Sequence, residues 1–246
     1  MATIIGARSS DRRSFDHLFF TAAAAGVLLL VFAGFARTYY LSGLLAAPSR
    51  VPEMGAVLHL HGAAFTLWIL LMAAQPALIA AGRVRLHVAL GSAGAVLALA
   101  VWLLGNLAAV QAIRTGYAEV GDPHALYAVT FFSMQAFAIS VALGFLWRRR
   151  AETHKRLMLL SNAAILEAAV GRLPSDWVVA TAPVSFYLGA DLVILAGILY
   201  DRWSRGRVHA VWLWGGGALV ASQVLRIAIM QTDAWFGFAR WAARLA

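Results

Sequence analysis

The sequence predicts an all-α integral membrane protein, built as a polytopic bundle of about seven transmembrane helices. Of its 246 residues, 62% are hydrophobic and only 13% are charged, whereas a soluble domain carries about 25% charged residues. The apolar residues are also gathered in blocks of about 20, the length that crosses the hydrocarbon core of a bilayer. We therefore expect one transmembrane domain over residues 1–246, with the lipid bilayer as its main partner.

Each predicted span is an apolar block bounded by charged or helix-breaking residues. The first block follows a basic segment and exceeds the apolar part of a signal peptide, so we expect it to stay as a helix. The fourth opens on Asp122 and Pro123, a helix-start signal. The fifth is the least regular, because Pro174 ends it early. The spans are 17–36, 56–81, 87–112, 125–147, 157–173, 183–200 and 209–230, with a core bundle at roughly 56–173.

Basic residues in the connecting segments set the predicted orientation, because cytoplasmic loops carry an excess of Lys and Arg. A cytoplasmic N-terminus places most of the 20 lysines and arginines on the inner side. The net charge of +9 then reflects orientation and contact with lipid headgroups, and we expect no nucleic-acid partner. The last segment, 231–246, is amphipathic and is expected to lie on the outer membrane surface.

Five histidines sort to the ends of the predicted spans. The second and fourth spans bring His59, His61 and His124 to the outer face, and the third and fifth bring His87 and His154 to the inner face. Alternate helices of a bundle lie across its core, where two axial ligands of a haem can converge. Because the chain has no cysteine, thioether-linked haem and iron–sulfur clusters are excluded. The pattern predicts one or two haems b, held by His87 with His154 and by His124 with His61 or His59.

Two questions stay open at these positions: whether the histidines bind a ligand at all, and whether His59 or His61 would be the ligand on the second span. A histidine can sit at a headgroup boundary without any ligand, as other side chains with a polar tip do. His59 shares a helix face with small residues such as Gly62, which let a helix or a macrocycle come close, and His61 shares a face with Phe65 and Trp68. The spacing does not choose between the two.

The alternating histidines resemble those of the ascorbate-reducible transmembrane cytochromes, in which a four-helix core binds two b-type haems through four histidines. The stretches "GRVRLHVALGSAG" (82–94) and "ETHKRLMLLSNAAILEAAVGR" (152–172) also resemble an uncharacterised family of bacterial predicted membrane proteins. That likeness covers roughly the second to fifth spans. The first resemblance implies haem b and electron transfer, and the second implies a bacterial inner membrane. Seven spans in place of six, and histidines nearer the helix ends, depart from the cytochromes.

Four charged residues lie inside the predicted spans, namely Glu167, Arg172, Asp191 and Arg226. A carboxylate in hydrocarbon costs about 3 kcal/mol on insertion scales, so these side chains should face the bundle interior. Three roles are open for the carboxylates: pairing with the arginines, carrying protons, or lining a solute or quinone pocket. The arginines are also candidates to hold haem propionates, since guanidinium suits anionic oxygens.

The sequence therefore favours a membrane b-type haem protein that moves electrons between a quinone or small reductant and an acceptor, as a transmembrane oxidoreductase. One alternative is a cofactor-free, proton-coupled transporter or channel that uses Glu167 and Asp191 as a relay. Another is an accessory or assembly subunit of a membrane complex, or a homo-oligomer. A retinal protein is excluded, because the last span has no lysine for a Schiff base.

Overall fold

The computed structural model describes residues 2–46 and 55–245, and within these ranges the chain forms helices and turns without a β-strand. This confirms the predicted all-α class. The elements are α1 (Ala2–Phe35), the π-helix η1 (Ala36–Tyr40), α2 (Ala56–Ala80), α3 (Val84–Thr115), α4 (Pro123–Leu146), α5 (Ala151–Ala163), α6 (Glu167–Val170), α7 (Asp176–Ala180), the 3-10 helix η2 (Val184–Tyr187), α8 (Leu188–Arg205), the π-helix η3 (Val211–Gly216), α9 (Gly217–Ile229) and α10 (Asp233–Leu245).

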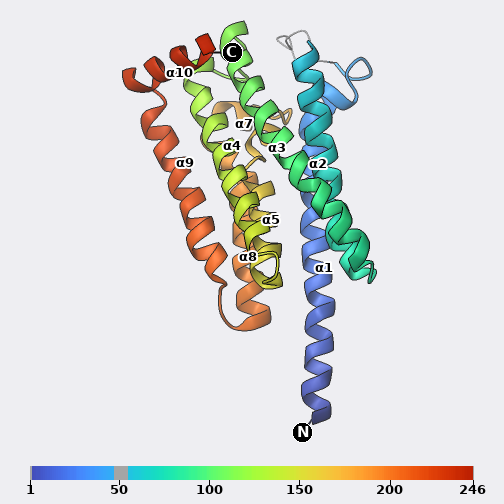
Figure 1. Ribbon diagram of the computed structural model, residues 1–246. Coiled ribbons are helices and arrows are strands. Elements are labelled where there is room, and N and C mark those ends of the chain that lie inside the picture. Colours follow the sequence, from blue (N-terminus) through green and yellow to red (C-terminus); the bar gives the residue numbers. More distant parts are fainter. Residues whose placement is uncertain (1, 47–54, 246) are drawn as a thin grey trace.

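Six helical segments among the described residues are long and apolar enough to cross a membrane, which makes the chain a multi-pass membrane protein. The two ends of the chain lie at opposite ends of the bundle (Figure 1). We call these the N-terminal end, where α1, α3 and α5 begin, and the C-terminal end, where α10 lies. The six segments are Ser14–Tyr40, Ala56–Ala80, Val84–Thr115, Pro123–Leu146, Val184–Arg205 and Val211–Ile229.

The fifth predicted span, 157–173, is corrected by the structure, because it is not one continuous helix. α5 ends at Ala163, a turn follows, and α6 has only four residues. Almost every side chain from Arg156 to Glu167 is buried against other helices. Irregular backbone at membrane depth is tolerated where protein, not lipid, surrounds it. The fifth pass is therefore made in pieces through the interior of the bundle.

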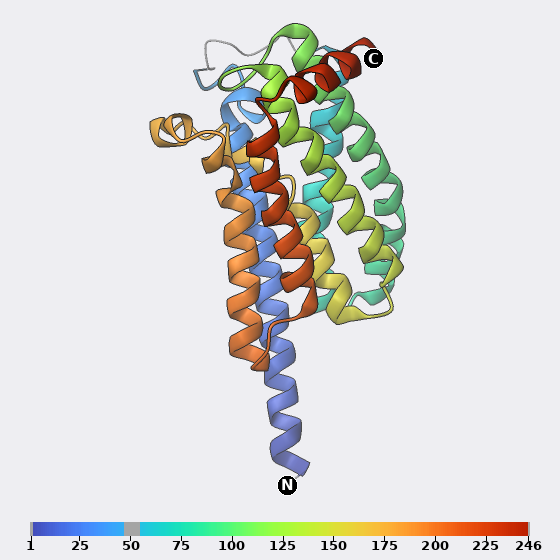
Figure 2. The ribbon, with the colours of Figure 1, turned by 90° about the vertical axis from the view of Figure 1, so that its left-hand side faces the viewer.

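Neighbouring helices in the chain also pack side by side, with α1 on α2, α2 on α3, α3 on α4 and α4 on α5. α8 packs on α5, and α9 packs on α4. α10 lies across the C-terminal end of the bundle (Figure 2), where Trp235 and Ala239 are buried against α3 and α4. α1 and α6 lie so close together that a Cβ at Gly34 would overlap the backbone of Ala169.

An ionic cluster ties α1, α5 and α8 together at the N-terminal end. Asp16 accepts from Lys155 at 2.9 Å and from Arg205 at 2.7 Å. Next to it, Arg156 donates from Nε to Asp201 at 2.9 Å, and both of these side chains are fully buried. Buried charges are stable only when paired, so this cluster fixes how the three helices meet.

Candidate functional site

His87 and His154 face each other at the N-terminal end of the bundle. His87 lies in the first turn of α3, and His154 lies in the first turn of α5. Their ring centroids are 6.4 Å apart, and the ring planes are nearly perpendicular at 89°. The tertiary structure thus brings together the two histidines that the sequence assigned to the inner face.

Both rings are held through Nδ1. Nδ1 of His154 lies 2.9 Å from the backbone oxygen of Gly144. Because a carbonyl only accepts, this contact places the His154 proton on Nδ1 and leaves the lone pair on Nε2. Nδ1 of His87 faces the side-chain amide of Gln75, which is buried between α2 and α3. The amide of Gln75 is satisfied with its nitrogen toward Nδ1 and the backbone oxygen of His87 and its oxygen toward the backbone N–H of Gly91, and in this orientation Nδ1 of His87 accepts.

The spacing of the two rings fits two ligands of one metal. A metal–nitrogen bond is about 2.0–2.1 Å, which puts two imidazole centroids on opposite sides of one iron a little over about 6 Å apart. Metal-bound histidines almost always use their other ring nitrogen to bond a carbonyl or other polar group, which fixes the ring. Gly144 supplies such an acceptor for His154, and Gln75 would supply one for His87 only with its amide oxygen turned toward Nδ1. The centroid spacing therefore matches two ligands of one iron, and it is also the spacing of an edge-to-face pair of rings.

The outer histidines are arranged differently. His59 is exposed on α2, while His61 points into a cavity. The ring of His124 stacks on Phe236 of α10 at 6.0 Å, and its Nδ1 lies 3.0 Å from Asp122. Among the described residues, no hydrogen bond or ring contact joins His124 to His61 or His59. The structure therefore does not bring together the outer pair named from the sequence.

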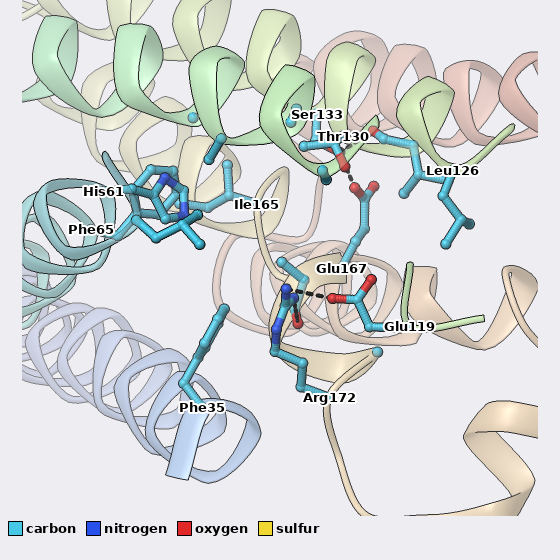
Figure 3. Close-up of a pocket in the computed structure, with 18 of the residues that line it drawn as sticks. Phe35, His61, Phe65, Glu119, Leu126, Thr130, Ser133, Ile165, Glu167 and Arg172 are labelled. Carbon is cyan, nitrogen blue, oxygen red and sulfur yellow. Dashed lines mark hydrogen bonds and ion pairs between the residues drawn. The ribbon is translucent and has the colours of Figure 1, made fainter. Parts of the chain in front are cut away.

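A cavity of about 240 Å³ lies at the C-terminal end of the bundle, between α1, η1, α2, α3, α4 and α6. Its wall is mostly apolar, and Figure 3 shows Phe35 and Phe65 on one side of it. A few polar side chains interrupt that wall. They include Thr38, His61, Tyr117, Glu119, Thr130, Ser133, Glu167 and Arg172.

Arg172 forms an ion pair with Glu119 at this cavity (Figure 3), and its guanidinium lies 4.8 Å from the centroid of Phe35. Glu119 precedes α4 in a connecting segment whose sequence carries no motif, so sequence reasoning missed it. Glu119 and Arg172 meet because the fold brings the segment after α3 next to the turn after α6.

Arg226 is fully buried and forms an ion pair with Glu167. Arg226 also donates to Ser133 at 3.0 Å and to Ser222 at 3.0 Å, and Ser133 donates to the second oxygen of Glu167. The other membrane-depth carboxylate, Asp191, accepts from the amide of Gln223 at 3.0 Å. Of the roles open to Glu167, the structure displays two: it pairs with an arginine, and it lines a pocket.

Both arginines named as candidates for haem propionates are thus beside carboxylates, and both lie away from the His87–His154 pair. The groups that sequence reasoning did not assign to a site are Gln75, Gly144, Thr38, Glu119 and Ser133. Only Gln75 gave a signal, as an amide inside an apolar span.

No family model, curated protein or solved structure matches the chain, so the family resemblances drawn from its histidine pattern stay predictions.

Proposed function

We propose that the chain is a membrane-embedded b-type haem protein that transfers electrons, with His87 and His154 as the axial ligands of one haem. The observation that carries this proposal is the geometry of the pair: 6.4 Å between centroids, perpendicular planes, and Nδ1 of His154 on a backbone carbonyl. Interfacial histidines without a ligand have no need to converge in this way.

When bound, the haem iron supplies the one-electron redox change. The chain supplies the rest. Gly144 accepts from Nδ1 of His154 and fixes its tautomer, and Gln75 would hold the ring of a ligating His87 by turning its amide oxygen toward Nδ1. α3 and α5 both begin at the N-terminal end of the bundle, so both histidines lie in first turns of helices there. α4, which lies between α3 and α5 in the chain, packs on both of these helices. Such fixed partners raise the basicity and restrict the rotation of bound imidazoles.

The proposal commits to one haem. A second haem at the outer histidines would require His124 to leave both Phe236 and Asp122, since it does not line the cavity that His61 faces. The electron donor remains a quinone or a small reductant, and the bacterial inner membrane remains the proposed location.

The test is a reduced-minus-oxidised absorption spectrum of the full chain, purified from haem-replete cells, with haem counted per chain. We expect about one haem per chain, with the low-spin signature of two imidazole ligands. His87→Ala and His154→Ala should each reduce bound haem at least tenfold, because either change removes an axial ligand.

His17→Ala is the matched control, since it removes a histidine from α1 near the same end of the bundle and should leave the haem spectrum unchanged. A colourless preparation would refute the proposal. So would a haem spectrum that survives both substitutions in the pair.

A further inference from the structure

The cavity at the C-terminal end of the bundle is long and narrow. Its wall runs along residues 58–69 of α2, 105–115 of α3 and 123–134 of α4. Each stretch covers about ten residue steps of 1.5 Å, so the wall is about 16 Å long. The volume of about 240 Å³, spread over that length, leaves a mean cross-section of about 15 Å². Carbon atoms in contact lie about 4 Å apart, so one extended hydrocarbon chain occupies roughly 16 Å². The cavity therefore has the dimensions of a single chain.

The character of the wall changes along its length. Tyr117 and Glu119 lie in the segment between α3 and α4, and Arg172 lies in the turn after α6, so these polar side chains gather where helices end (Figure 3). Deeper in the bundle, the wall contains buried apolar residues such as Ile69 and Ile165. The cavity is partly open. It therefore suits an amphiphile whose polar part stays at the C-terminal end and whose apolar part points inward.

The polar atoms deeper in the wall are occupied or shielded. Glu167 is paired with Arg226 and also accepts from Ser133. Nδ1 of His61 and Oγ1 of Thr38 are shielded from solvent, so they do not face the free space. A polar or charged group placed there would lose its contacts with water and gain no partner, which is costly. The inner part of the cavity therefore favours hydrocarbon.

Ala168 indicates that the free space reaches the interior of the bundle. Its neighbours Glu167 and Ala169 are only 2% and 1% exposed, but Ala168 itself is exposed and lines the cavity. An apolar cavity of about 150 Å³ excludes water and binds apolar molecules such as benzene. This larger, narrower space lies in a membrane-spanning bundle, where the most abundant apolar molecules are lipids.

We propose that the cavity binds one acyl chain of a membrane phospholipid, which runs inward between α2, α3 and α4. The headgroup stays at the C-terminal end, near Glu119 and Arg172. Because these two side chains neutralise each other, the site selects the acyl chain and not the charge of the headgroup. The wall at Gly105 lies 18 residues from His87 on α3, or about 27 Å along the helix, so the inference does not rest on the proposed function.

The test is photochemical labelling of the full chain in phosphatidylcholine nanodiscs. The probe is a phosphatidylcholine with a diazirine near the end of one acyl chain, and labelled residues are identified by mass spectrometry. We expect label on the cavity residues Met134 and Ile165, which are 4% and 8% exposed and are thus shielded from bulk lipid by other helices. Label on Leu192, an exposed residue of α8, reports contact with bulk lipid and is the internal standard.

Two substitutions obstruct the cavity from different elements. Ala108→Phe on α3 and Ala168→Phe on α6 each add a ring to the wall. Each should lower the label on the interior residues at least tenfold relative to the internal standard. Ala95→Phe is the matched control, because it makes the same change at an exposed position of α3 outside this wall and should leave the ratio unchanged. Circular dichroism of each variant shows that it is folded.

Label confined to exposed residues of the unaltered chain would overturn the inference. So would interior label that survives both obstructing substitutions in folded protein. A free fatty acid with the same diazirine chain is the second probe. Interior label from the fatty acid but not from the phospholipid would overturn the assignment to a phospholipid.

Discussion

Glu167 and Arg226 form an ion pair inside the bundle, and its removal separates a structural role for Glu167 from a role as a proton carrier. The substitution is Glu167→Gln. Glu167 is 2% exposed and Arg226 is 0% exposed, so the variant leaves a guanidinium buried with only neutral oxygens around it. Those oxygens are the hydroxyls of Ser133 and Ser222, each 3.0 Å away, and the backbone oxygen of Val129 at 3.5 Å.

The expected cost follows from that arrangement. Removing one partner of a buried pair costs about 3–5 kcal/mol, because the remaining charge is uncompensated. At about 2–4 °C per kcal/mol for a chain of this length, the midpoint of thermal unfolding should fall by roughly 10 °C. Removing both charges, as in Glu167→Gln with Arg226→Met, should restore most of the stability, since two neutral side chains need no counter-charge.

The assay is thermal unfolding in one detergent at one scan rate, followed by the fluorescence of the nine tryptophans. Asp191→Asn is the matched control, because Asp191 is half-buried and is bound by the neutral amide of Gln223. It should change stability by less than about 1 kcal/mol. A Glu167→Gln variant that melts within about 2 °C of the unaltered chain would refute the reasoning and favour a proton carrier.

Two further predictions concern the cap of α4 and the histidine pair. Asp122→Ala removes the side chain that accepts from the backbone N–H of His124 at 2.7 Å, so it should cost about 1 kcal/mol and speed amide exchange in the first turn of α4. Burial raises the pKa of Asp122, but its hydrogen bonds with His124 outweigh this effect and hold the pKa below the usual 3.8. The cap should therefore act fully above about pH 4 and be lost as the pH falls through the lowered pKa. Amide exchange in the first turn of α4 that stays constant from pH 6 to pH 2, after correction for intrinsic rates, would contradict this prediction. Gln75→Leu removes the amide at Nδ1 of His87 and should weaken haem binding about 10–100-fold, measured as the rate of haem transfer to an acceptor protein. The absorption spectrum should keep its two-imidazole character. An unchanged transfer rate would show that Gln75 does not hold the ring.

Local sequence signals predicted some details of the fold correctly. The Asp122–Pro123 signal starts α4 where expected, because the cap and the first turn involve only adjacent residues. The fifth span failed as a continuous helix, although its composition is apolar. Whether a segment is surrounded by lipid or by protein depends on the other helices, and the interior position of α5 is what permits the break at 164–166.

The sequence by itself determined that this protein is an α-helical membrane protein, and it predicted at which end of the bundle each of the five histidines lies, because each residue advances a helix by about 1.5 Å. Only the tertiary structure decided which side chains meet. Helix rotation places His61 in the cavity and leaves His59 exposed, and the docking of α10 places Phe236 against His124. Such contacts depend on how each helix is rotated and on partners far away in the chain. The spacing of residues within one helix gives no information about either.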